Sequence, residues 1–272
     1  MTYSLIKNQC AINKRLRQLG IMCLLAVILG TPWVAVGEAL SLEAKAREIF
    51  ETKKHAAVTI QMVINMRFSM GGNTQERENN VEVTGTVISP DGKTVVALSA
   101  ADPSALMRTM SDDDIQMSIE INDVKIMLPD GDEIDAQVVL RDNDLDLAFI
   151  MPLERPESPM TYASLDEIGE PELFDQVLAI NRLGRVANRV YSGSLERIEA
   201  IVERPRKYYI PGSEPTNTDM GCPAFTLDGD FVGIFVVRAV RDTGGSGSNM
   251  MPILVPADEI AYAAEQAPGF DD

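Results

Sequence analysis

The sequence predicts an all-β protein, built as barrels or as sandwiches, with helices at its two ends. Short runs rich in β-branched residues recur along the chain, separated by turns that contain glycine and proline, as in barrels and sandwiches. Two turns read Pro-Asp-Gly, at 90–92 and 129–131, each between two apolar runs, which is typical of β-hairpins. A polar, proline-bearing stretch at 155–160 then separates two halves.

The first 39 residues have the pattern of a signal peptide rather than of folded structure. A basic stretch at 14–17 precedes the short apolar run GIMCLLAVIL at 20–29, and small residues follow it. The apolar run is shorter than the roughly 20 residues that a membrane-spanning helix needs. We therefore expect export to the periplasm or the extracellular space, with cleavage near Ala39; the alternative is a retained N-terminal anchor.

The remaining elements follow in order along the chain. Helices are expected where apolar residues recur at helical spacing, and strands where β-branched residues cluster. The dipeptide Asp102-Pro103 suits the start of a short helix. The predicted elements are a helix at 40–55, a strand at 56–66, a hairpin within 79–99, helical turns at 103–110, a hairpin within 119–152, strands at 172–180, 188–202, 231–238 and 250–255, and a helix at 256–267.

The mature chain is expected to be strongly acidic. The whole sequence has a formal net charge of −17. The leader contains four of the 24 basic residues and one of the 41 acidic ones, so 20 basic and 40 acidic residues remain, a net charge of −20. Such a charge repels nucleic acid and anionic lipid head groups. We therefore expect neither as a partner, and no membrane span once the leader is removed.

Cleavage would also leave Cys222 as the single cysteine, so no internal disulfide is expected. The acidic run SDDD at 111–114, near Asp123, lacks the alternating ligand spacing of a calcium loop. We interpret it as a solvated loop and expect neither a metal nor a cofactor.

Five stretches of the chain share a recognisable pattern: GTVISPDGKTVVALSAA (85–101), VKIMLPDGDEIDAQVVLRDNDLDLAFI (124–150), VLAINRLGRVANRVYSGSLERI (177–198), TDMGCPAFTLDGDFVGIF (218–235) and ILVPADEI (253–260). Taken in order, they resemble the trypsin-like serine proteases, particularly the HtrA-type bacterial branch. The resemblance implies two six-stranded β-barrels, at 56–155 and at 156–272 with the C-terminal helix, and an active site in the cleft between them. It implies nothing about oligomeric state.

The resemblance also locates the positions of the catalytic triad. Asp146 lies at the aspartate position, Ser99 at the histidine position and Met220 at the nucleophile position. Thr218 and Met220 fall at the oxyanion-hole positions, with Thr218 replacing a glycine. A thioether has no proton to lose, and a serine hydroxyl is not a base near neutral pH. We therefore expect a pseudoprotease.

Other residues of the chain are candidates to replace the missing nucleophile and base. His55, the single histidine, lies before the first predicted strand, and Cys222 lies two residues from the nucleophile position; we interpret His55 as structural or exposed and Cys222 as a small buried side chain. Asp146 and Asp219 could form a carboxylate pair. The basic and aromatic stretch RPRKYY at 204–209 could recognise an acidic peptide or polymer.

Three functions follow from these patterns. The first is an exported, non-catalytic protease homologue whose cleft binds an extended peptide or protein segment by strand addition. The second is an active serine-type endopeptidase with unorthodox catalytic residues. The third is a purely structural subunit whose cleft is filled by its own side chains.

Overall fold

The computed structural model describes residues 33–70, 73–104, 116–212, 220–241 and 248–270. The chain divides into two units, 1–44 and 45–272. Of the first unit, the structure describes the helical residues 33–44. Both barrels belong to the second unit.

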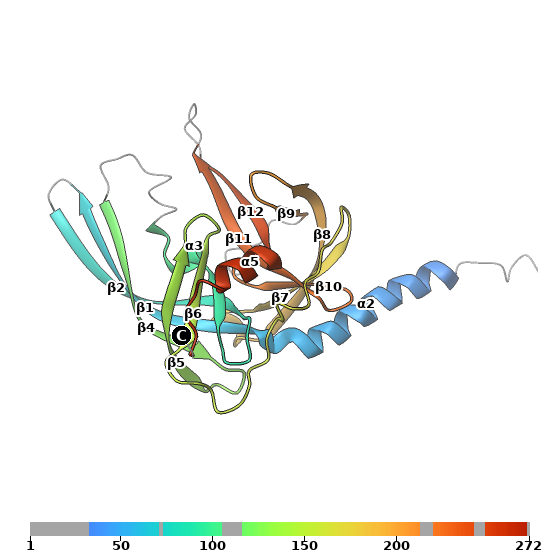
Figure 1. The fold of residues 1–272 in the computed structure, drawn as a ribbon, viewed down its shortest axis with the longest axis horizontal. Helices are drawn as coiled ribbons and strands as arrows, with labels where there is room; N and C mark the ends of the chain where they lie inside the picture. The colour runs from blue at the N-terminus through green and yellow to red at the C-terminus, as the bar shows by residue number, and fades with distance from the viewer. Residues whose placement is uncertain (1–32, 71–72, 105–115, 213–219, 242–247, 271–272) are drawn as a thin grey trace, which may run out of the picture. The chain divides into compact units, whose positions relative to one another are not determined.

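The structure confirms the predicted fold class: the described chain forms two closed, six-stranded antiparallel β-barrels (Figure 1). The first has the strand order β1-β2-β3-β6-β5-β4 and the second β10-β11-β12-β9-β8-β7. The strands of the first are β1 (Ala57–Met70), β2 (Asn73–Val87), β3 (Thr94–Ala97), β4 (Gln116–Met127), β5 (Glu133–Asp142) and β6 (Leu147–Pro152). Those of the second are β7 (Gln176–Arg182), β8 (Tyr191–Val202), β9 (Tyr208–Pro211), β10 (Pro223–Thr226), β11 (Phe231–Arg241) and β12 (Ser248–Pro256).

Both Pro-Asp-Gly stretches are turns, as predicted. In the first turn, the backbone N–H of Gly92 donates to the carbonyl of Ser89 at 3.1 Å. In the second turn, the N–H of Gly131 donates to the carbonyl of Leu128 at 3.2 Å. Both glycines have positive φ, 91° and 97°, which glycine adopts without steric cost. These turns connect β2 to β3 and β4 to β5.

The N-terminal helix is longer than the predicted span of 40–55. Helix α2 covers Trp33–Lys53, and a 3-10 turn over Lys54–Ala56 leads into β1. The helix begins directly after Pro32, a point where proline is tolerated. The leader prediction falls mainly on residues 1–32, outside the described residues, and stays a prediction. Within the described chain, no helix combines the length and the apolar character needed to cross a membrane.

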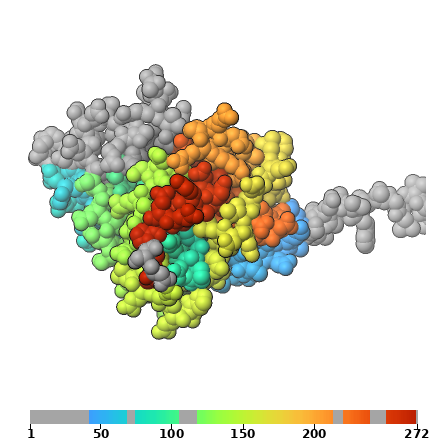
Figure 2. Space-filling view, in the orientation of Figure 1, coloured from blue at the N-terminus to red at the C-terminus, as the bar shows by residue number. Residues whose placement is uncertain are grey.

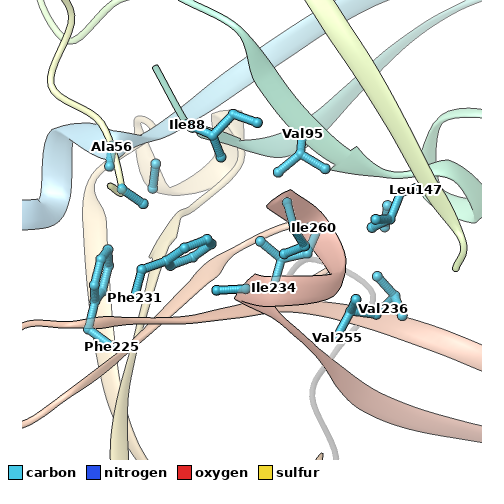
Figure 3. Packing of buried hydrophobic residues seen from close by; sticks show 14 of the residues in the cluster. Ala56, Ile88, Val95, Leu147, Phe225, Phe231, Ile234, Val236, Val255 and Ile260 are labelled. Carbon is cyan, nitrogen blue, oxygen red and sulfur yellow. The ribbon is translucent and has the colours of Figure 1, made fainter. Parts of the chain in front are cut away.

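One hydrophobic cluster joins the two barrels, in addition to a separate cluster inside each barrel. Figure 3 shows Ile88, Val95 and Leu147 of the first barrel opposite apolar side chains of the second barrel, with Ile260 among them. Ile260 belongs to α5 (Ala257–Ala264) and is fully buried. The side chains from the second barrel are Phe225, Phe231, Ile234, Val236 and Val255. Burying each such side chain contributes roughly 1.5–3 kcal/mol, so the joining cluster holds the barrels together.

Helix α5 is held against the first barrel as well as the second. In Figure 2 the C-terminal segment, in red, lies on the surface against segments of both barrels. The ammonium of Lys93, in the turn between β2 and β3, donates to the carbonyl of Ala267 at 2.8 Å. It also lies 3.4 Å from the carbonyl of Ala264. A cation at the C-terminal end of a helix is favourable, so Lys93 fastens this end of the chain.

The short helix α3 (Leu98–Ala101) follows β3, so helices are not confined to the two ends of the chain. Helical turns were predicted at 103–110. The N–H of Ser104 donates to Oδ1 of Asp102 at 3.0 Å, as an N-cap requires. The rest of that prediction lies outside the described residues.

Candidate functional site

A cleft of about 390 Å³ lies between the two barrels. The first barrel contributes residues of β1 and β2 and the corner after β3; the second contributes the end of β7, the turn before β10, and β11. The cleft is lined by Thr59, Val81, Glu82, Val83, Thr84, Ser99, Ala100, Pro103, Arg182, Leu183, Gly184, Met220 and Val237. Its volume falls within the range of about 300–1,000 Å³ typical of ligand pockets.

Two of the predicted site residues, Ser99 and Asp146, are in direct contact. The Ser99 hydroxyl donates to Oδ2 of Asp146 at 2.6 Å, and the Ser99 backbone N–H donates to Oδ1 at 2.7 Å. The N–H of Leu98 donates to the backbone carbonyl of Asp146 at 2.8 Å. Asp146 itself has a φ of 59°, a left-handed conformation that aspartate tolerates better than most residues. The corner between β3 and β6 is therefore fixed around this carboxyl.

The Asp146 carboxyl also joins the two barrels. It accepts a hydrogen bond from the backbone N–H of Val237 on β11. Burial raises its pKa from 3.8 to about 6, while the hydrogen bonds from Ser99 and Val237 act in the opposite direction. Burial prevails because removing a carboxylate from water is costly. The group is thus mainly ionised at pH 7 and mainly protonated at pH 5.

The third predicted site residue, Met220, lines the same cleft as Ser99 and is 5% exposed. The next residue fixes the turn. Gly221 has a φ of 85°; its N–H donates to the carbonyl of Phe235 at 2.7 Å, and its carbonyl accepts from the Thr86 hydroxyl at 2.8 Å. A Cβ at this position would collide with the backbone carbonyl of Thr84. The turn is therefore packed tightly against β2.

The other predicted candidates do not reach the cleft or fall outside the described residues. Thr218 and Asp219 lie outside, as does the acidic run 111–114. Cys222 is buried in the core of the second barrel. His55 Nδ1 lies 3.3 Å from the Tyr191 hydroxyl, and the two rings meet edge to face. Neither Cys222 nor His55 lines the cleft.

The basic stretch 204–209 lies beside acidic side chains. Arg206 is 3.4 Å from Glu259, and Lys207 is 3.7 Å from Glu170. The positive charge of this stretch is therefore partly balanced within the protein, which weakens it as a site for an acidic ligand. Among the described residues, no group of three or more His, Cys, Asp or Glu side chains could hold a metal ion.

One edge of β11 borders the cleft. Phe235 exchanges backbone hydrogen bonds with the turn before β10: its carbonyl accepts from Gly221 and its N–H donates to Cys222. The pairing of β11 with β10 extends no further along β11 than Ile234. From Val236 to Arg241, the strand partner within the described residues is β12. The N–H and C=O groups of every second residue point to the same side of a strand. The N–H and C=O groups of Val237 and Ala239 therefore face the same side as those of Phe235.

Sequence reasoning missed a charged contact across the cleft. Glu82 of β2 receives hydrogen bonds from Arg185 and Arg189, in the loop after β7. Arg182 at the end of β7 donates to the carbonyls of Met127 at 2.6 Å and Leu128 at 3.0 Å. The available signal was the stretch RLGRVANR, which places three arginines within eight residues of an acidic chain.

Comparison with known proteins leaves the site to be interpreted on its own geometry. No family model and no curated protein matches the chain. The fold class defined here is a pair of closed antiparallel barrels, and the candidate site is the cleft that holds Ser99 and Met220, with Asp146 beneath it.

Proposed function

We propose that the chain is an exported, non-catalytic homologue of the trypsin-like serine proteases, of the HtrA-type branch, and that its cleft binds an extended peptide or protein segment. One observation carries the proposal. The Asp146 carboxyl accepts a hydrogen bond from Ser99, at the position where a protease would have a histidine. At the nucleophile position, the buried side chain of Met220 lines the cleft.

The chemistry of these side chains supports binding without turnover. Acyl transfer needs a nucleophile that can form a covalent bond to a carbonyl carbon and a base that accepts the nucleophile's proton. The Met220 thioether can do neither step in hydrolysis. Losing one such member of a protease triad lowers kcat by roughly a millionfold in the system where it was measured. The proposal therefore assigns the cleft to recognition.

The shape of the cleft supports an extended ligand. Its volume of about 390 Å³ remains beside Met220, which favours a binding site over a cleft filled by its own side chains. On β11, Val237 lines the cleft, and both Val237 and Ala239 lie beyond the last residue paired with β10. The Val237 N–H donates to Asp146, so an added strand would use the Val237 carbonyl and the backbone groups of Ala239. An extended segment can add to such an edge through backbone hydrogen bonds, which require no catalytic residue.

A fluorophosphonate probe tests the absence of catalysis. We expect purified protein to remain unlabelled at pH 8, with trypsin as the positive control. Stoichiometric labelling would contradict the proposal. Binding is tested by retention of peptides from a random library on immobilised protein, with the Ala239→Pro variant removing the N–H that a bound strand would use.

An active endopeptidase is the second candidate, because one specific contact favours it. The Ser99 hydroxyl is 2.6 Å from a carboxyl oxygen of Asp146, and Ser99 lines the cleft. Here Asp146 would take the hydroxyl proton as Ser99 attacked a carbonyl. We rank it second because a carboxylate whose pKa is about 6 is a weak base towards a serine hydroxyl. Labelling that is lost in Ser99→Ala would establish it.

A further inference from the structure

The proposed cleft has a cluster of arginines at one side, in an acidic protein. The formal net charge of the chain is −17, yet Arg182, Arg185 and Arg189 all lie at one side of the cleft. Arg182 lines it directly, and the other two contact Glu82, which also lines it. Two carboxylates act on this group: Glu82 accepts hydrogen bonds from Arg185 and Arg189, and Glu133 acts on Arg189 through its charge. A segment bound there meets a different electrostatic environment from the rest of the surface.

Arg185, Arg189 and Glu82 form a bridge between the barrels, which we call the arginine clasp. Arg185 Nε donates to Glu82 Oε1 at 2.7 Å. Arg189 Nη2 donates to the same oxygen at 2.6 Å, and its Nε lies 3.3 Å from Oε2. The Glu82 side chain is 16% exposed and that of Arg185 61% exposed. The two arginines lower the pKa of Glu82, although its burial acts in the opposite direction. Glu82 is therefore held as a carboxylate.

Arg185 retains hydrogen-bonding capacity for a ligand. Its contact with Glu82 uses Nε, and within the described residues its two Nη groups donate to no acceptor. A guanidinium presents its donors in a planar fork that matches a carboxylate. At 61% exposure, this unused side of the fork is accessible from solvent at the rim of the cleft.

The loop that carries Arg185 is held by its own backbone. The N–H of Leu183 donates to the carbonyl of Val190 at 3.0 Å, and the N–H groups of Ala187 and Arg189 donate to the carbonyl of Gly184 at 3.0 and 3.2 Å. Because the loop is already ordered, a ligand that contacts Arg185 loses less conformational entropy on binding than it would with a flexible loop.

We infer that the arginine clasp selects an extended segment that carries a carboxylate, which binds the two Nη groups of Arg185 beside Glu82. This inference rests on the proposed function, since it names the class of segment that the cleft takes. The overall negative charge opposes it only weakly, because at physiological salt the Debye length is about 8 Å. A guanidinium–carboxylate pair at contact distance is a strong, directional hydrogen-bonded interaction.

The test uses a fluorescein-labelled peptide taken from the retained library pool, measured by fluorescence anisotropy. Versions of this peptide carry Glu, Gln or Lys at each position in turn, and a further pair ends in a free or an amidated C-terminal carboxyl. For wild-type protein we expect one position at which Glu binds about tenfold tighter than Gln. The C-terminal pair shows whether a side-chain or a terminal carboxylate is recognised.

Two substitutions connect this preference to the clasp. Arg185→Gln should remove most of the preference for Glu over Gln. Glu82→Gln removes the internal carboxylate that competes for the arginines, so the preference should increase. The control is Arg67→Gln, because Arg67 has the same 61% side-chain exposure and also pairs with a single carboxylate, that of Glu76, but does not line the cleft. It should leave the preference unchanged.

The outcomes separate the two claims. If peptides bind wild-type protein with equal affinity for Glu, Gln and Lys at every position and for both C-termini, this inference is wrong and the proposed function stands. If Arg67→Gln reduces the preference as much as Arg185→Gln does, the effect is one of overall charge, and the clasp has no selective role. If no peptide is retained at all, both the proposed function and this inference fail.

Discussion

The Asp146 carboxyl gives the sharpest prediction for the folded protein, because its environment opposes ionisation. Its pKa in the folded chain is about 6, raised from 3.8 mainly by burial. A raised pKa means that the folded state binds the proton more tightly than the unfolded state does. The associated stability is fully present below pH 3.8 and is lost as pH rises through 6. At ~1.36 kcal/mol per pKa unit, the shift corresponds to about 3 kcal/mol.

The perturbation is Asp146→Asn, which removes the titration at this position. We expect the free energy of unfolding of the wild type, minus that of the variant, to fall as pH rises. About 2 kcal/mol of the change should appear between pH 4.5 and pH 8, since the unfolded group is largely ionised over that range. The assay is urea denaturation at a series of pH values, in which unfolding is monitored by far-ultraviolet circular dichroism.

Asp144→Asn serves as the control for loss of one negative charge, because Asp144 is two residues away and its side chain is 83% exposed. A difference between wild type and Asp146→Asn that stays constant from pH 4.5 to pH 8 would refute the reasoning. It would mean that the carboxyl is well hydrated, and hence that it does not lie beneath Ser99 and against Val237.

Three further predictions concern stability. Gly221→Ala should lower the free energy of unfolding by about 3–5 kcal/mol, because the added methyl group would meet the Thr84 carbonyl at a positive φ. The control, Gly131→Ala, lies at a positive φ with open space around it and should cost about 1 kcal/mol. Chemical denaturation measures both. Lys93→Met should cost about 1–2 kcal/mol by removing the cation that caps α5, and no loss would contradict that contact. His55 has a lowered pKa, mainly through burial, so stability should fall as pH drops below 6.5 in the wild type relative to His55→Gln.

Much of the fold could be predicted because local patterns set it. The β-branched runs and the Pro-Asp-Gly turns specify strands and hairpins within a few residues of each other. Gly92 and Gly131 occupy the turn positions that their sequence indicated. Helix α2 begins at Trp33, before the predicted start at 40, and includes Gly37, a residue that disfavours a helix interior.

The candidate site was less accessible to sequence reasoning, because its contacts join distant residues. The spacing of residues does not show that Ser99 meets Asp146, 47 positions later; that expectation came from the resemblance. Glu82 and Arg189 are 107 positions apart, and no local pattern specifies that the barrels bring them together. The raised pKa of Asp146 depends on burial between the barrels, which exists only in the folded chain.

The central claim is that the cleft binds an extended segment and does not cut it. The most direct measurement is mass spectrometry of both partners after the protein has been incubated with a random peptide library at pH 8 and the complexes have been recovered. We predict intact retained peptides and an unmodified protein. Cleaved peptides, or an acyl group on Ser99, would contradict the claim.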